Sequence, residues 1–209
     1  MALSDNDKQN IVIIKYNAGN IQSVLYAFER IGIKAIVTDD HDLIRNADKV
    51  VFPGVGEASS AMNYLRERQL DQLIKQLRQP VLGICLGMQL MCMHSEENDT
   101  ACLGIFDEEV KLFRPGHRKE KVPQIGWNNI FHLKTGLFDG IREQSYIYSV
   151  HSYYASEGAQ TIATADYIHA YSAALHRDNF YGVQFHPEKS AAAGEHILKN
   201  FFALNQDKK

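Results

Sequence analysis

The sequence predicts an α/β protein, a three-layer sandwich with a mixed, mainly parallel central sheet and an antiparallel extension in its second half. Two observations predict this class. Short apolar runs alternate with helical patterns up to about residue 105, and strand-like runs then follow one another with short turns between them. Alternation of strands and helices is typical of a parallel sheet with helices on both faces. Since no linker or repeat interrupts residues 1–209, we expect one domain.

The elements are expected in the following order. Apolar runs of four to six residues predict buried strands, and apolar side chains at helical spacing, stopped by Gly32 or Pro80, predict helices. The first half contains strand 11–16, helix 20–32, strands 33–38 and 49–52, one or two helices in 57–79, strand 81–85 and a helix over 87–94. The second half contains strands 108–113, 124–131, 144–154, 160–167 and 179–185, and a closing helix over 191–204.

The composition excludes several classes of function. The formal net charge is −3, from 22 basic and 25 acidic residues, so no basic field indicates a nucleic-acid partner. No apolar run approaches the roughly 18 residues of a membrane helix. The polar start "MALSDNDKQN" lacks the apolar core of a secretory signal, and the three cysteines are an odd number. Reduced thiols and a cytoplasmic location are therefore expected.

The segment "PVLGICLGMQ" contains the pattern Gly-x-Cys-x-Gly around Cys85. A sharp turn between a strand and a helix raises the central side chain out of the sheet, and glycines on either side allow the neighbouring backbone to pack closely. The thiol then lies at a helix N-terminus, which favours a thiolate by only about 0.3–1 kcal/mol. A second group must therefore activate Cys85. Taken alone, the pattern also fits a buried structural cysteine.

The segment "GVQFHPEKS" supplies candidates for that second group, His186 and Glu188. Residues i and i+2 of a strand face the same side, so we expect the carboxylate to hold one ring nitrogen while the other faces Cys85. Such an arrangement suits acyl transfer through a thioester. A third segment, "FPGVG", makes a turn after a strand, and its amides could stabilise an oxyanion together with the amide of Leu86. An ordinary Pro-Gly loop is the alternative for this turn.

Five motifs carry a resemblance to a known family. They are, in chain order, "FPGVG", "GICLGMQ", "VPQIGWN", "YSVHSY" and "GVQFHPEKS". Together they resemble a class I glutamine amidotransferase, and more narrowly the glutaminase subunit of imidazole glycerol phosphate synthase. The resemblance extends over about residues 11–205 and implies a flavodoxin-like, class I glutaminase fold.

The resemblance also implies roles for individual residues. Cys85 would be the nucleophile, His186 the base and Glu188 its orienting partner, with the amides of Val55 and Leu86 forming the oxyanion hole. The implied binding residues for L-glutamine are Gly56, Gln89, Glu97, His151, Ser152 and Tyr153. Without the family, Gln89 would equally be a polar residue of a first helical turn and Glu97 a solvated loop carboxylate. A carboxylate is nevertheless the group that a substrate ammonium requires.

A partner is implied as well. The glutaminase pattern uses nearly the whole chain, so the ammonia acceptor would be a separate polypeptide, in this family a (β/α)8-barrel cyclase that forms a heterodimer with the glutaminase. The implied interface residues are Trp127, Asn128, Tyr148 and Lys189. Gln124 stands where many relatives have histidine, which leaves details of that interface open. No cofactor and no metal is implied, and the spacing of Cys92, His94 and Cys102 matches no zinc signature.

Three other functions remain to be distinguished. The glutaminase of another pathway, such as anthranilate or guanylate synthesis, would share the nucleophile but not "PGVG" and "IGWN". A catalytically inactive regulatory protein of the same fold would usually lack the cysteine or the histidine, which are both present here. A cysteine peptidase would not need the pair of Gln89 and Glu97, which fits a free amino acid better than a peptide chain.

Overall fold

The central sheet is parallel through the five strands at one end of its order and mostly antiparallel beyond them. The structure is a computed structural model that describes residues 9–17, 19, 21–116 and 120–204. The parallel strands run in the order β2-β1-β3-β4-β13. Their bounds are β1 Ile11–Ile14, β2 Ala35–Thr38, β3 Lys49–Gly54, β4 Val81–Cys85 and β13 Phe180–Val183. The predicted mixed, mainly parallel sheet is confirmed.

The second half of the chain extends the sheet on the β13 side. The order continues β12-β10-β7-β5-β6, with β11 paired to β12, and all of these pairings except β5 with β7 are antiparallel. The bounds are β5 His94–Ser95, β6 Thr100–Ala101, β7 Glu109–Leu112, β10 Tyr153–Ala155, β11 Thr161–Asp166 and β12 Ala170–Arg177. A separate two-stranded antiparallel sheet is formed by β8 Gln124–Asn129 and β9 Tyr146–His151.

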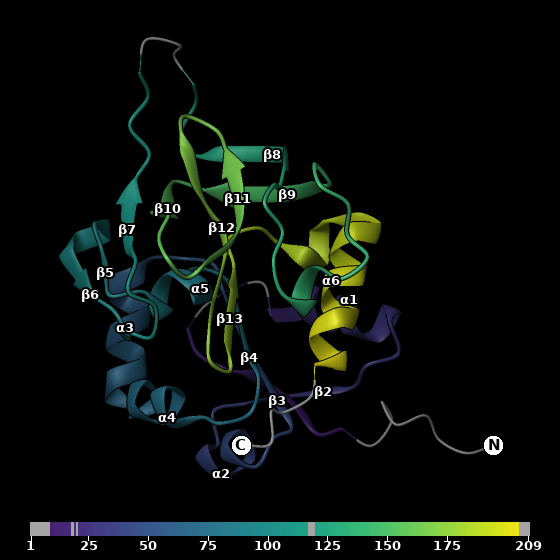
Figure 1. Ribbon diagram of the computed structural model, residues 1–209. Coiled ribbons are helices and arrows are strands. Elements are labelled where there is room, and N and C mark those ends of the chain that lie inside the picture. Colours follow the sequence, from purple (N-terminus) through teal and green to yellow (C-terminus); the bar gives the residue numbers. More distant parts are fainter. Residues whose placement is uncertain (1–8, 18, 20, 117–119, 205–209) are drawn as a thin grey trace.

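Helices cover both faces of the parallel strands (Figure 1). On one face, α1 Ile21–Arg30 and α6 Ala191–Ala203 pack in one apolar cluster that includes Phe28, Phe201 and Ile13. On the other, α2 His41–Arg45, α3 Ala58–Glu67 and α4 Leu70–Gln76 pack in a second cluster that includes Leu65 and Val12. Because successive side chains of a strand point to opposite faces, the fully apolar β1 contributes side chains to both clusters. This is the three-layer arrangement that the sequence predicts.

Several local expectations differ from the structure. Segment 57–79 forms two helices, which is one of the two alternatives expected, because Gln69, with φ of 57°, breaks the helical path between them. The helix after Cys85, α5 Leu86–Met91, ends before Cys92, and His94 begins β5 instead of ending that helix. Cys92 is nevertheless fully buried. Strand β12 has no counterpart among the predicted strands, although it is central to the antiparallel half.

The strand ends place the functional segments together. Gly54 at the end of β3 pairs with Cys85 at the end of β4, and β13 runs parallel beside β4. The carboxyl ends of parallel strands are where α/β proteins build their sites. The three segments singled out from the sequence lie at the carboxyl ends of β3, β4 and β13.

Tyr16 carries a buried polar group that the fold does not satisfy. Its hydroxyl has no hydrogen-bond partner within the described part of the chain, and a Cβ atom added to Gly54 would lie 2.1 Å from it. Burial, and then the charge of a Cys85 thiolate, raise the pKa of the Tyr16 phenol. An unpaired buried hydroxyl costs free energy that an apolar ring of the same shape avoids.

We therefore predict that Tyr16→Phe increases the free energy of unfolding by about 1 kcal/mol, or Tm by about 2–4 °C. The matched control is Tyr171→Phe, since the buried Tyr171 hydroxyl donates to Gln124 at 3.1 Å and its removal should lower Tm. Thermal unfolding of the two variants measures both effects. A lower Tm for Tyr16→Phe would contradict the assignment of an unsatisfied hydroxyl.

Candidate active site

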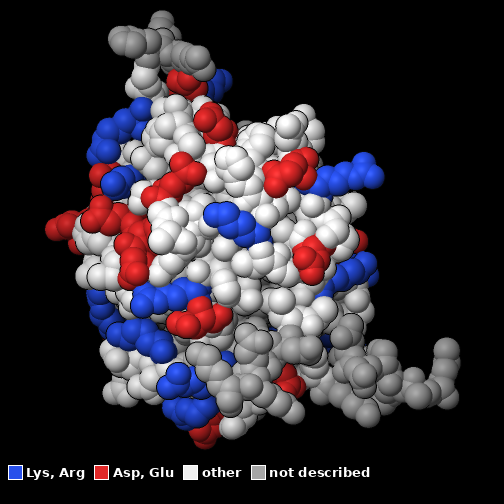
Figure 2. Space-filling view, viewed as in Figure 1, with Lys and Arg blue, Asp and Glu red and all other residues white. Residues whose placement is uncertain are grey.

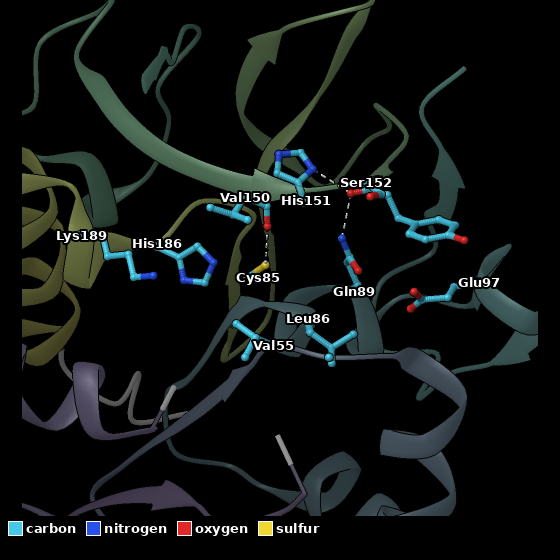
Figure 3. A pocket seen from close by; sticks show the side chains of 12 residues that line it. Val55, Cys85, Leu86, Gln89, Glu97, Val150, His151, Ser152, His186 and Lys189 are labelled. Carbon is cyan, nitrogen blue, oxygen red and sulfur yellow. Dashed lines mark hydrogen bonds between the residues drawn. The ribbon is translucent and has the colours of Figure 1, made fainter. Parts of the chain in front are cut away.

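A cavity of about 260 Å³ opens at the ends of β3 and β4 (Figure 3). It gathers residues from distant parts of the chain, and its walls include every residue expected from the sequence to bind L-glutamine. The lining residues are Val55, Gly56, Cys85, Leu86, Gln89, Glu97, Val150, His151, Ser152, Tyr153, His186 and Lys189. His186 and Lys189 lie on one side of Cys85, and Gln89 and Glu97 lie on the other (Figure 3). Glu188 lies outside the lining, against His186.

Cys85 occupies a strained turn between β4 and α5. Its φ of 52° and ψ of −109° are a conformation that residues with a Cβ rarely adopt. The close packing around the turn requires the two glycines of the motif. A Cβ on Gly87 would lie 1.8 Å from the carbonyl oxygen of Phe52, and one on Gly83 would lie 2.8 Å from the amide nitrogen of Met88. The turn therefore has the strand-to-helix geometry that the sequence pattern predicts.

His186 and Glu188 are in contact, but not as residues of a strand. Strand β13 ends at Val183, and His186 precedes a 3₁₀ turn, Pro187–Lys189, in which Pro187 takes the first position. The expectation that strand alternation aligns the two side chains is therefore wrong. The turn instead brings His186 Nδ1 to 2.7 Å from Glu188 Oε1, and both residues are buried.

The environment of His186 favours its protonated form. Burial alone lowers its pKa, but hydrogen bonds to Cys85 and Glu188 and the charges of those two groups outweigh burial, so the pKa of His186 is raised. Because Nδ1 faces the carboxylate, Nε2 is the nitrogen available to the thiol. The arrangement can hold a thiolate beside an imidazolium, which is the activated form of a cysteine nucleophile.

His151, at the end of β9, is the opposite case. Burial lowers its pKa to about 4, so the ring is neutral at physiological pH. Its Nδ1 lies 2.8 Å from the carbonyl oxygen of Tyr153, and a carbonyl can only accept, so Nδ1 carries the proton. His151 lines the cavity without adding charge to it. Ser152 and Tyr153 line the same wall.

Gln89 and Glu97 form the part of the cavity beyond Cys85. The Nε2 atom of Gln89 donates to the carbonyl oxygen of Tyr153 at 2.9 Å. Glu97 Oε2 accepts from the amide of Ala58 at 2.8 Å, and burial raises the pKa of Glu97. A cationic group in the cavity would supply the opposite charge that this half-buried carboxylate lacks. Val55 and Gly56 lie on the third side, where Gly56 has φ of 131°, a conformation that favours glycine.

The expected interface residues lie on or beside the two-stranded sheet. Trp127 is 54% exposed and makes an edge-to-face contact with Tyr148 at 5.7 Å between ring centroids. Lys189 Nζ lies 6.0 Å from the centre of the Tyr148 ring and also lines the cavity. Asn128, in contrast, donates from Nδ2 to the carbonyl oxygen of Asp166. Trp127, Tyr148 and Lys189 thus form a continuous path to the cavity.

Two residues of the site are not among the sequence candidates. The carbonyl oxygen of Val150 lies 3.8 Å from Cys85 Sγ, and Gln184 Nε2 also lies 3.8 Å from that sulfur. Gln184 stands inside the quoted motif "GVQFHPEKS", which was the available signal. Val150 contributes only a backbone atom, so the identity of its side chain gave no signal in the sequence.

Within the described residues, no group of three or more His, Cys, Asp or Glu side chains is placed to hold a metal ion. His94 instead contacts Asp99 at 2.8 Å. No helix in that part of the chain is long and apolar enough to cross a membrane. On the face shown in Figure 2, lysine and arginine side chains are interspersed with aspartate and glutamate.

Comparison with known proteins agrees with this geometry. The model of the family "Glutamine amidotransferase class-I" matches residues 12–204. Among solved structures, PurLQS from Thermotoga maritima gives a TM-score of 0.64 at 13% identity, covering 93% of this chain and 97% of that one. A glutamine amidotransferase from the same organism gives 0.60 at 16%, covering 92% and 82%. At such identities these structures support the fold alone. The chain belongs to the class I glutamine amidotransferase family.

Curated relatives narrow the family further. The chain is 58% identical to imidazole glycerol phosphate synthase subunit HisH of Bacteroides fragilis, over 93% of this chain and 99% of that protein. It is 55% identical to the subunit of the same name from Bacteroides thetaiotaomicron over the same shares, and 44% identical to that of Vibrio cholerae over 94% and 99%. Within the class, the chain is thus a member of the HisH family.

Replacing the carboxylate of Glu188 tests whether its charge stabilises the protonated ring of His186. We predict that Glu188→Gln lowers the free energy of unfolding by about 1 kcal/mol near pH 6, because the amide oxygen still accepts from Nδ1 but carries no negative charge to stabilise the protonated ring. The raised pKa of His186 means that this contribution is complete below about pH 6.5, the ordinary histidine value, and diminishes as pH rises from there toward the raised pKa. Urea unfolding at pH 6 and pH 9 measures it. A difference that grows with pH would contradict the prediction.

Proposed function

We propose that this chain hydrolyses L-glutamine to glutamate and ammonia through a thioester on Cys85, with residues 1–209 as one amidotransferase domain. The observation that carries the proposal is the order of groups along one cavity. Cys85 and His186 lie at one end, Glu97 lies at the other, and Gln89 lies between them. This order suits a free amino acid whose amide carbon meets the sulfur while its ammonium meets the carboxylate.

The chemistry follows from these positions. The thiolate of Cys85 attacks the amide carbon, and the negative charge on the carbonyl oxygen is stabilised by the amides of Leu86 and Val55. His186 gives its proton to the departing ammonia, which leaves a thioester. His186 then takes a proton from water, the resulting hydroxide attacks the thioester, and glutamate leaves as the thiolate is restored. Glu188 orients the ring throughout, and no cofactor is needed.

The ammonia would pass to a separate cyclase. The relatives are named as a subunit of imidazole glycerol phosphate synthase, which supports a partner subunit. We take that partner to be the (β/α)8-barrel cyclase that the family resemblance implies, in a cytoplasmic heterodimer. The products there would be imidazole glycerol phosphate and aminoimidazole carboxamide ribotide, formed in histidine biosynthesis. The same names favour this partner over the synthases of anthranilate or guanylate.

An exposed apolar face supports a partner at this position. The side chains that point outward from β8 and β9 include Ile125, Trp127 and Tyr146, which are 64%, 54% and 62% exposed. Val150 lies on the same face, directly across from Ile125, and its carbonyl oxygen is in contact with Cys85 Sγ. A partner that covers this face would also lie over the mouth of the cavity, where released ammonia must leave.

The nucleophile is tested by Cys85→Ala in the reconstituted complex with the cyclase. Glutamine-dependent synthesis should vanish because no thioester forms, whereas synthesis from added ammonium should persist because the acceptor site lies on the other chain. Both rates are measured from product formation. A variant that retains its glutamine-dependent rate would show that Cys85 is not the nucleophile.

The partner face is tested by Trp127→Ala, which should weaken binding of the cyclase by about 30-fold, as loss of a central aromatic anchor typically does. Tyr26→Ala is the matched control, because Tyr26 on α1 is also 54% exposed. Calorimetric titration with the cyclase measures both affinities. Equal affinities for the two variants would exclude the β8–β9 face as the centre of the interface.

A further inference from the structure

Gln184 lies buried between the nucleophile and a residue of the cavity wall. It follows β13, is 1% exposed, and is held by a backbone hydrogen bond from its amide to the carbonyl oxygen of Ala173 at 2.8 Å. Its side chain is in hydrogen-bond contact with both Gln89 and Cys85. A buried carboxamide is expensive unless both its oxygen and its nitrogen are paired, so these two contacts define what the side chain does.

The orientation of both carboxamides follows from one backbone atom. The carbonyl oxygen of Tyr153 can only accept, so the atom of Gln89 that faces it at 2.9 Å is the nitrogen, Nε2. The same nitrogen lies 3.0 Å from Gln184, so the atom of Gln184 that it meets is the oxygen, Oε1. The nitrogen of Gln184 is thereby turned to Cys85 Sγ, 3.8 Å away.

The other groups around Cys85 Sγ indicate what the contact with Gln184 does. A neutral Cys85 thiol donates to the carbonyl oxygen of Val150 at 3.8 Å. A thiolate has no proton to donate, and the negative end of that carbonyl dipole would oppose its charge. A thiolate at Cys85 therefore needs hydrogen-bond donors in place of the contact with the Val150 carbonyl. Gln184 Nε2 supplies one such N–H.

We propose that Gln184 is a second hydrogen-bond donor to the Cys85 thiolate, beside His186, and that Gln89 holds it in the donating orientation. The role in catalysis rests on the proposed function above. The N–H would stabilise the sulfur anion before attack on the amide carbon and again when the thiolate is expelled from the thioester. The chain Gln89–Gln184–Cys85 links the wall that contacts substrate to the nucleophile.

The test is Gln184→Met, which fills a similar volume and cannot donate. The measurement is the rate of alkylation of Cys85 by iodoacetamide against pH, read by tandem mass spectrometry that locates the label on Cys85, so that Cys92 and Cys102 do not contribute. The midpoint should move up by about one pH unit, with alkylation about tenfold slower at neutral pH. In the complex, kcat for glutamine hydrolysis should fall by about tenfold or more with KM changed less than about twofold.

Gln79→Met is the matched control, since Gln79 is also a buried glutamine and donates to the carbonyl oxygen of Ile44 at 2.8 Å. Its alkylation midpoint should equal that of the wild type. If Gln184→Met does not unfold cooperatively, Gln184→Asn withdraws the amide from the sulfur by one methylene and is expected to shift the midpoint in the same direction. A folded Gln184 variant with the wild-type midpoint would overturn the proposal.

The outcomes separate this inference from the proposed function, because alkylation requires neither glutamine nor the cyclase. A wild-type complex that does not hydrolyse glutamine would refute the proposed function. The midpoint of Cys85 alkylation would still test the contact between Gln184 and Cys85. Normal hydrolysis by the wild type with an unchanged midpoint in Gln184→Met would refute the contact alone.

Discussion

The strained turn at Cys85 is the constraint on which the rest of the site depends. It places a thiol with positive φ at the start of α5, and it is possible only because glycine at position 87 lets the helix approach the backbone of Phe52. The parallel pairing of β3, β4 and β13 then brings the carboxyl ends of these three strands to the same edge. Every group of the proposed chemistry is positioned relative to that one sulfur.

The two histidines of the cavity differ in their protonation state. His186 and His151 both line the cavity, and burial acts to lower the pKa of both. At His186 the neighbouring thiol and carboxylate outweigh burial and the ring keeps its proton, whereas at His151 burial prevails and the ring stays neutral. The loop that carries His186 is also tied to the exposed sheet, since the amide of His186 donates to the carbonyl oxygen of Tyr148 at 2.9 Å and the amide of Tyr148 donates to Ser190 Oγ. A protein bound to β9 would therefore contact a strand that is hydrogen-bonded to the loop that carries His186 and Glu188.

Periodicity and motif spacing predicted the layers, the parallel half and the turn at Cys85, because these features follow from local sequence. They did not predict β12, whose burial on both sides of the strand becomes apparent only when β11 and β13 pair with it. The contact of His186 with Glu188 was expected from strand alternation, but Pro187 starts a 3₁₀ turn that achieves it by a different path. Gln184 was overlooked because its significance lies in contacts with residues 95 and 99 positions away in the chain.

The central claim is that the thiol on the turn and the imidazole of His186 form one ionised pair. The most direct measurement is the titration of the His186 ring by NMR in the wild type and in Cys85→Ala. We expect a pKa above the ordinary value of about 6.5 in the wild type, and a clear decrease when the sulfur is removed. An unchanged His186 titration in the variant would mean that the two groups do not share a proton, and the proposed mechanism would be wrong.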